Sequence, residues 1–291
     1  MISQEYDGYR TYSCDICTSS EAREVPHVRK YTGGQLIHIC NNCGFVYVRE
    51  RRSSTTIADV WSNALFGDVY TSATPLFRSR HIYVAEFLDQ EIGLKDRLVL
   101  DVGAGEGNFL SVVRDLYGAR VFGVEPSEAN CKILQSLEID HFCGTLEEFA
   151  NSRPTIRPQV ATMMWTLENT VNPRSVLQHC HSILDDHSHI LVATGSRIMV
   201  PFSKLLNLYL SQSPVDVHPS RFSRNSLENI LRVSGFDPRF NRYAGDTLLL
   251  GLGRKLENAT DPELAIDSPE QVEEFFEKWH QMTEWFQSLE G

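Results

Sequence analysis

Two pairs of cysteines near the start of the chain have the spacing of metal ligands. Cys14 and Cys17 form one C-x2-C pair, and Cys40 and Cys43 form a second. Each pair places two sulfur atoms on one tight turn, and four thiolates complete a tetrahedral zinc site with no open coordination position. Because a closed site cannot activate water, we predict that this zinc ion is structural. His38, two residues before Cys40, is a further candidate ligand.

The other cysteines lack this spacing. The chain holds seven cysteines in all, and in a reducing compartment the paired arrangement indicates metal binding and not disulfides. We therefore expect Cys131, Cys143 and Cys180 to be small buried residues.

A glycine-rich loop follows an apolar run that ends in Asp101. The loop reads V-G-A-G-E-G-N over residues 102–108, and a helical pattern begins at Phe109. Glycines let the backbone approach a ligand and leave the helix N-terminal amides free to face it. A dinucleotide fold requires G-x-G-x-x-G, but here the third glycine comes one residue early and position 108 is asparagine. The Asp101 carboxylate would oppose a pyrophosphate and would suit an ammonium or sulfonium cation.

A second acid ends the next apolar run, 121–125. An acid at this point of the second strand can accept hydrogen bonds from both hydroxyls of a ribose. Either feature alone has a structural interpretation, as a turn or as a solvated strand end. Together, Asp101 with its glycine loop and Glu125 predict a nucleoside-binding site.

The elements that must position these residues alternate between strand and helix. Apolar runs over 97–101, 121–125, 159–165 and 189–194 are separated by helical patterns. Strands that are apolar on both faces are typical of a parallel sheet covered by helices. The sequence therefore predicts a doubly wound α/β domain over residues 76–255.

Two further regions precede this domain. Residues 1–50 hold both cysteine pairs and short β-like runs, which indicates a compact zinc-binding module. Residues 51–75 are rich in serine and threonine with scattered aromatic residues, and they are interpreted as a linker and lid.

The acidic charge of the chain is concentrated in residues 256–291. The chain has a formal charge of −11, and this segment, with ten acids and one base, accounts for −9 of it. Ser268 and Gln271 form a capping box around Pro269, and apolar residues recur at helical spacing up to Leu289. The segment is predicted to be an amphipathic helix that packs on the α/β domain or contacts a second copy or another partner.

The composition is that of a globular protein, with 42% hydrophobic and 22% charged residues among 291. The first residues lack the apolar core of a secretory signal, and no stretch approaches the ~20 apolar residues of a spanning helix. We expect a soluble cytoplasmic protein that does not bind membranes.

Four motifs together resemble a known family. They are D-V-G-A-G-E-G-N-F-L at 101–110, V-E-P-S at 124–127, W-T-L-E-N-T-V-N-P at 165–173 and H-I-L-V-A-T-G-S at 189–196. In this order and spacing they resemble the S-adenosylmethionine-dependent methyltransferases, which implies a Rossmann-like seven-stranded sheet and S-adenosylmethionine as cofactor.

The resemblance also implies a role for individual residues. Asp101 and the glycine loop would hold the methionine end of the cofactor, and Glu125 its ribose. Further residues would wall the adenine or line the methyl-donor side, and Tyr70 of the linker would close over the cofactor. The cofactor-binding residues implied are Asp101, Gly103, Ala104, Gly105, Gly107, Asn108, Glu125, Pro126, Thr145, Leu146, Trp165, Leu167 and Tyr70. The family's usual L-E-H reads L-E-N at 167–169, which removes a histidine from the donor side.

The cysteine module narrows the resemblance. Together with H-I-C-N-N-C-G-F-V-Y-V at 38–48, it is similar to the N-terminal zinc domain of methyltransferases that act on sugars in natural-product and surface-glycan pathways. This likeness implies a small-molecule acceptor, such as a nucleotide-linked sugar or a sugar phosphate.

The segment V-D-V-H-P-S-R-F-S at 215–223 matches the acceptor-facing loop of this family. We hypothesise that His218 is the catalytic base or an acceptor ligand, with Arg221 placed to take a phosphate or carboxylate. Alternatively, the loop only caps the next helix and His218 packs. Arg78 and Arg80 are candidates to hold an anionic acceptor. The histidines at 179, 181, 187 and 189 are expected on a solvated face and turn.

Two other functions fit the sequence less well. A zinc-containing RNA methyltransferase would need a basic surface, yet residues 1–50 hold five bases against six acids. A non-catalytic subunit that binds the cofactor and recruits a partner is a second alternative, and the intact Asp101, Glu125 and glycine loop favour an enzyme over it. A small-molecule methyltransferase is therefore the leading interpretation, nucleic acid is an unlikely partner, and a homodimer stays open.

Overall fold

The computed structural model describes residues 3–6, 9–53, 74–152, 155–202, 204–210, 218–244, 248–257 and 262–289. Every structural statement below concerns these residues. Tyr70 and most of the predicted linker lie outside them.

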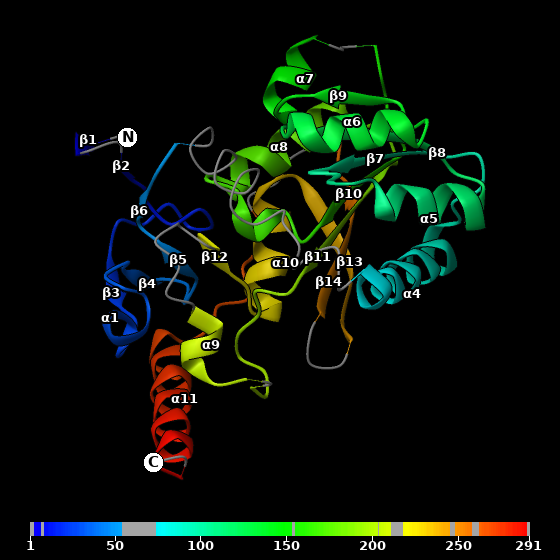
Figure 1. Ribbon diagram of the computed structural model, residues 1–291. Coiled ribbons are helices and arrows are strands. Elements are labelled where there is room, and N and C mark those ends of the chain that lie inside the picture. The colour runs from blue at the N-terminus through cyan, green and yellow to red at the C-terminus, as the bar shows by residue number, and fades with distance from the viewer. Residues whose placement is uncertain are drawn as a thin grey trace.

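A seven-stranded sheet forms the centre of the molecule (Figure 1), in the order β13-β14-β11-β10-β7-β8-β9. The ladders that join the five strands from β11 to β9 are parallel, whereas β14 runs antiparallel to both β11 and β13. The strands are β7 (Leu98–Val102), β8 (Arg120–Glu125), β9 (His141–Cys143), β10 (Val160–Met164), β11 (His189–Thr194), β13 (Phe236–Ala244) and β14 (Leu248–Lys255).

Helices cover both faces of this sheet, which explains why β10 and β11 are buried along their whole length. Alternate strand residues face opposite layers: Val99 packs in the first and Leu100 in the second. The first layer contains α4 (Thr74–Ile92), α5 (Asn108–Tyr117) and α6 (Glu128–Ser136), and the second contains α7 (Leu146–Ser152), α8 (Pro173–Ile183) and α10 (Arg224–Val233). The predicted Rossmann-like doubly wound sheet is confirmed. No helix in the described ranges has both the length and the apolar composition to cross a bilayer.

The N-terminal module contributes two small antiparallel sheets. One has the order β1-β2-β6 and the other β12-β5-β4-β3. Their elements are β1 (Ser3–Tyr6), β2 (Tyr9–Thr11), β3 (Ala22–Glu24), β4 (Ile37–Cys40), β5 (Val46–Val48), β6 (Glu50–Arg51) and β12 (Ser220–Arg221), with the short helix α1 (Val28–Tyr31) after β3.

Strand β12 joins the module to the rest of the chain, because it comes from the segment just after His218. Ser220 pairs with Tyr47 and Arg221 with Val46. The module and the acceptor-side segment are therefore parts of one sheet.

Helix α11 (Pro269–Leu289) lies beside the module and the short helix α9 (Leu206–Leu210), as Figure 1 shows. It buries Val272, Phe276 and Trp279 in a cluster that includes residues of β4, β5 and α9. The predicted helix thus packs on the N-terminal module and on α9.

The acidic face of α11 pairs with basic residues of the module. Arg23 contacts Glu270 at 3.0 Å and Glu273 at 2.9 Å, and Lys30 Nζ lies 2.8 Å from Glu284. Exposed pairs of this kind stabilise a protein only weakly, so the buried apolar residues hold the helix in place.

Candidate active site

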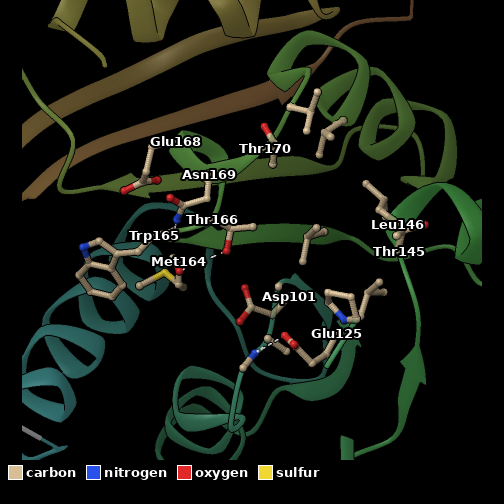
Figure 2. Close-up of a pocket in the computed structure, with 18 of the residues that line it drawn as sticks. Asp101, Glu125, Thr145, Leu146, Met164, Trp165, Thr166, Glu168, Asn169 and Thr170 are labelled. Carbon is tan, nitrogen blue, oxygen red and sulfur yellow. Dashed lines mark hydrogen bonds between the residues drawn. The ribbon is translucent and has the colours of Figure 1, made fainter. Parts of the chain in front are cut away.

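A cavity of about 1080 Å³ lies at the carboxyl ends of β7, β8 and β10. After β9 the chain returns to the other side of β7 to form β10, and ligands of open α/β sheets bind at such a point of reversal. Figure 2 shows acidic side chains from β7 and β8 facing residues that follow β10 across this space. The cavity slightly exceeds the ~300–1,000 Å³ typical of small-molecule sites, so it has room for a nucleoside and a second small molecule.

Asp101 lies at the carboxyl end of β7 and is buried at the base of the cavity. Its Oδ1 accepts a hydrogen bond of 2.6 Å from the Thr162 hydroxyl. Burial, with a smaller contribution from the charge of Glu125, raises the pKa of Asp101 to about 7, against the opposing effect of the Thr162 hydrogen bond. A cationic ligand group would remove the cost of keeping this carboxylate ionised.

Glu125 ends the neighbouring strand β8 and is fixed by backbone amides. Its Oε2 accepts from Gly105 N–H at 2.8 Å, and its Oε1 accepts from Ser127 N–H at 2.9 Å. Burial raises its pKa, and the amide hydrogen bonds lower it. The carboxylate therefore faces the cavity in a set orientation.

The glycine loop takes a backbone conformation that side chains rarely adopt. Gly103 has φ +70°, and a Cβ there would lie 2.7 Å from the Thr166 side chain. Gly107 has φ +76°, and a Cβ there would lie 2.6 Å from the Leu134 side chain. Gly103, Ala104, Gly105 and Asn108 line the cavity, whereas Gly107 does not and serves the packing of α5 against α6.

Most of the remaining cofactor residues predicted from sequence also line the cavity, namely Pro126, Thr145, Leu146 and Trp165. Leu167 is the exception. It is fully buried in the core between the sheet and the α7–α8 layer, in the 3-10 helix η2 (Leu167–Asn169), so its predicted place on the donor side is wrong. Successive residues of a 3-10 helix point in three different directions. The sequence pattern after the strand did not indicate a 3-10 helix, so it did not indicate which of these residues points away from the cavity.

Glu168, next along η2, borders the cavity and is fully buried. Its Oε1 accepts from Gly195 N–H at 3.2 Å, whereas Oε2 has no hydrogen-bond partner within the described residues. Burial raises the pKa of Glu168 to about 7, although hydrogen bonds from Thr194 and Gly195 favour the ionised form. The sequence analysis gave this residue no role, and its only signal was its place in the L-E-N motif.

His218 borders the other end of the cavity, and its Nδ1 has no partner in the part of the chain that the structure describes. Burial, and then the charges of Arg221 and Lys204, lower its pKa to about 3. His218 is therefore neutral at pH 7. Its φ of 56° places it in the left-handed region, which sets the direction of the chain into β12.

Many other residues that line the cavity were not predicted to be part of the site, among them two histidines and an arginine. His81 on α4 packs edge-on against Trp165 with ring centroids 5.4 Å apart, and burial lowers its pKa to about 4. His179, expected on a solvated face, lines the cavity from α8, and Arg10 lines it from β2. No local motif marks these positions, because α4, α8 and β2 meet here only in three dimensions. Of the predicted anion-binding pair, Arg80 lines the cavity and Arg78 does not.

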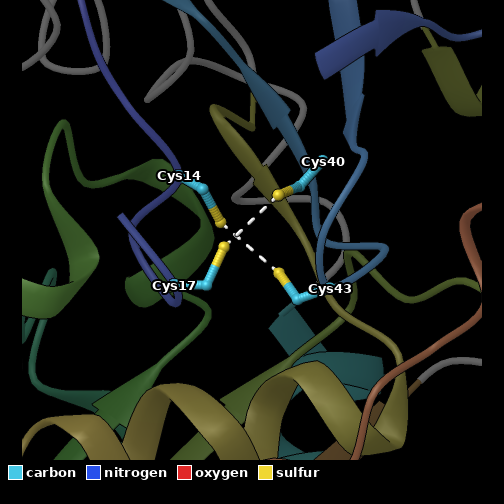
Figure 3. Close-up of side chains that lie close together, drawn as sticks. All are labelled: Cys14, Cys17, Cys40 and Cys43. Atoms are coloured by element: carbon cyan, nitrogen blue, oxygen red, sulfur yellow. Dashed lines mark hydrogen bonds between the residues drawn. The ribbon is translucent and has the colours of Figure 1, made fainter. Parts of the chain in front are cut away.

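The four cysteines of the module converge on one point (Figure 3). Their sulfur atoms all lie within 4.8 Å of one another, with 3.5 Å between the sulfurs of Cys14 and Cys43 and 3.4 Å between those of Cys17 and Cys40. A tetrahedral zinc ion with Zn–S bonds of ~2.3 Å requires sulfurs ~3.8 Å apart, so these ligands fit zinc. His38 is not part of this cluster.

The expectation that Cys131 and Cys143 are simply small buried residues is wrong, because these two cysteines form a disulfide. Cys131 of α6 and Cys143 of β9 are bonded, with their Cα atoms 5.9 Å apart, and Cys143 is exposed. The two residues meet because α6 leads directly into β9 beside β8. Cys180 is free and fully buried, as predicted.

Solved structures define the class of this fold. An S-adenosylmethionine-dependent methyltransferase of Thermotoga maritima matches with a TM-score of 0.51 at 18% identity, covering 68% of this chain and 99% of its own. A second match is the 1,6-didemethyltoxoflavin-N1-methyltransferase of Burkholderia thailandensis, solved with bound 1,6-didemethyltoxoflavin and S-adenosylhomocysteine. Its TM-score is 0.55 at 16% identity, and the match covers 75% of this chain and 98% of that chain. The fold is that of the S-adenosylmethionine-dependent methyltransferases.

Sequence comparison then assigns the family. A family described as "Methyltransferase domain" matches residues 79–239, more than half of the chain, and the chain belongs to this family. Ubiquinone biosynthesis O-methyltransferases of Marinobacter nauticus and Chromobacterium violaceum are 34% and 31% identical over 119 and 118 residues. Both matches cover 38% of this chain. They span about half the length of these curated relatives, 49% and 50%.

Proposed function

We propose that the protein is an enzyme that transfers a methyl group from S-adenosylmethionine to a hydroxyl group of a small polar molecule. The observation that carries this proposal is the pair of buried carboxylates, Asp101 and Glu125, at the ends of adjacent strands in one cavity with the glycine loop. The names of the O-methyltransferase relatives support oxygen as the acceptor atom.

The cofactor half of the cavity suits the charge of this cofactor. When bound, S-adenosylmethionine supplies an electrophilic methyl group on a sulfonium. Asp101 would hold the ammonium group of its methionine end, and Glu125 would accept from the ribose hydroxyls. Asp101 would gain a cationic partner that it lacks among the described residues, and Glu125 would gain hydroxyl donors in addition to its backbone amides.

Short polar side chains also line the cavity. Thr166, Asn169, Thr170, Asn172 and Ser175 all border the cavity. Hydroxyl and amide groups can orient a polyhydroxylated acceptor, which supports a nucleotide-linked sugar or glycan precursor. In this proposal His218 accepts the proton of the attacking hydroxyl group, and much of the rate comes from holding acceptor and methyl in line.

We further propose that the four module cysteines hold a structural zinc ion. Four sulfurs from two tight turns, at distances that fit a tetrahedron, support this. With four protein ligands the ion would have no position for a substrate, so it would act by fixing the module.

The pairing of α11 with the module argues against RNA as the acceptor. Arg23 and Lys30, two of the bases that a phosphate backbone would need, already contact glutamates of α11. The acidic helix would also repel the phosphates nearby.

Calorimetry with S-adenosylhomocysteine tests the cofactor assignment. Asp101→Asn should weaken binding about 10- to 100-fold, because it removes a charged hydrogen bond of about 1.5–3 kcal/mol. The exposed Asp115 on α5 is a matched control, and Asp115→Asn should bind like the wild type. Absence of binding to the wild-type protein would refute the proposal.

Methyl transfer from labelled S-adenosylmethionine then tests the acceptor. Nucleotide sugars, phenolic compounds and RNA should be compared in parallel. Label on a sugar hydroxyl supports the proposal, whereas label on phenols alone or on RNA alone would replace it.

A further inference from the structure

Two arginines are fully buried, and they differ sharply in their partners. Arg51 is held by Asp15, with contacts of 2.6 and 3.3 Å, and donates through Nε to the Val48 carbonyl at 2.6 Å. Arg221 is 1% exposed, yet it forms no ion pair with any described residue, and its Nε has no hydrogen-bond partner. A buried guanidinium without a counter-charge is costly, so an anionic partner would stabilise Arg221.

The side chains around Arg221 also include hydrogen-bonding groups without partners and a second cation. Its Nη1 donates to the His218 carbonyl at 2.9 Å, and its guanidinium lies 5.8 Å from the centre of the Tyr209 ring. Lys204 Nζ lies 5.5 Å from the same ring. The Tyr209 hydroxyl and His218 Nδ1 are buried and have no hydrogen-bond partner among the described residues. The cluster thus holds two cations and several unsatisfied donors.

The charge of Glu168 acts on this cluster but does not neutralise it. Glu168 is near enough for its charge to raise the pKa of Tyr209, but it is bound to Gly195 N–H. Its own pKa of about 7 leaves it only partly ionised at neutral pH.

Two members of the cluster, His218 and Lys204, line the cavity, whereas Arg221 and Tyr209 do not. Arg221 is joined to this wall through its hydrogen bond to the His218 carbonyl. Side chains of both charges line the cavity, namely the acids Asp101, Glu106, Glu125, Glu147 and Glu168 and the bases Arg10, Arg80 and Lys204. Of these bases, Lys204 is close enough to His218 for its charge to lower the pKa of the imidazole.

We propose that Lys204, Tyr209, His218 and Arg221 form a subsite for an anionic group, a phosphate or a carboxylate, carried by the methyl acceptor. The inference rests on the proposed function, because it takes the cavity beside His218 to be the acceptor site. An anion would supply the acceptor oxygens that the unsatisfied donors lack and the counter-charge that Arg221 lacks.

The subsite has a consequence for His218. After burial, the charges of Arg221 and Lys204 are what lower its pKa. An anion that offsets both charges would raise the pKa of His218, so the acceptor's own charge would make the neighbouring imidazole a stronger base.

The test titrates inorganic phosphate and acetate, separately, into the full chain saturated with zinc and S-adenosylhomocysteine, at constant ionic strength. Calorimetry should detect binding of at least one of the two anions, and the anion that binds identifies the source of the charge. Arg221→Gln should weaken this binding about 10- to 100-fold, and Lys204→Ala should weaken it less, because Lys204 is exposed. Arg232→Gln on α10, which removes the same charge away from the cavity, should change nothing.

Two results would overturn the inference: no binding of either anion to the wild-type protein, or equal binding to the wild type, Arg221→Gln and Lys204→Ala. The affinity for S-adenosylhomocysteine, measured first in each variant, shows whether that variant folds. If Arg221→Gln does not fold, Lys204→Ala decides alone. Failure of the wild-type protein to bind S-adenosylhomocysteine would count against the proposed function, whereas its binding without anion affinity would count only against the subsite.

Discussion

Replacing His218 with asparagine should make the protein more resistant to mild acid. The pKa of His218 is lowered from 6.5 to about 3, so the unfolded chain takes up a proton below pH 6.5 that the folded protein refuses. The stability that comes from a neutral His218 is therefore complete above pH 6.5 and is lost as the pH falls. Between pH 7.5 and pH 5 the loss is about 2 kcal/mol for the wild type and zero for a residue that does not titrate.

Asparagine is the right substitution because it tolerates the positive φ of this position. Urea unfolding of zinc-saturated protein at pH 7.5 and pH 5 gives the two free energies of unfolding. The buried His81 and His189 add the same pH dependence to both proteins, so the difference isolates His218. His187→Asn, at an exposed turn, is the control and should follow the wild type. Parallel pH dependences for His218→Asn and the wild type would show that His218 is not buried in its neutral form.

Three further predictions follow from the structure. Removing the proposed zinc ion with a chelator should abolish turnover while S-adenosylhomocysteine still binds, because the ion would fix β5 and through it β12. Retained turnover in zinc-free protein, checked by metal analysis, would contradict this. Glu168→Gln should raise the free energy of unfolding above pH 8 by up to about 3 kcal/mol. The wild-type carboxyl group, with a pKa of about 7, is ionised at that pH at a cost that the amide avoids. Equal free energies of unfolding for the two proteins at pH 8 would refute the burial argument. A phosphine reductant should lower the free energy of unfolding by about 2–3 kcal/mol by opening the Cys131–Cys143 disulfide, and the Cys131→Ser variant should not respond to it.

The sequence predicted the parts of the site that depend on local order. Asp101 and Glu125 each end an apolar strand, and parallel strands bring their carboxyl ends to one edge, so their meeting could be inferred without coordinates. The same holds for the cysteines, because each C-x2-C pair is a local turn. The glycine loop was only partly predicted: Gly107 lies in the same motif as Gly103 but supports helix packing.

Contacts between distant segments could not be predicted in this way. Strand β12 is two residues long, too short for a periodic pattern, and yet its pairing with β5 decides where Arg221 lies. His81 and His179 reach the cavity from helices whose sequence gives no sign of a ligand. The acidic helix was predicted, but its basic partners on the module were not, because charge complementarity does not specify which of several surfaces is covered.

The position of α11 also constrains how the molecule assembles during synthesis. Arg23 and Glu273 are separated by 250 residues, so the module can form its zinc site early while the apolar face of β4 stays uncovered until α11 has left the ribosome. Contacts of such long sequence separation form late in folding and leave surface exposed to aggregation in the interval. A nascent or truncated chain that lacks residues 269–289 would therefore present the apolar side of the module to solvent, where molecular chaperones bind.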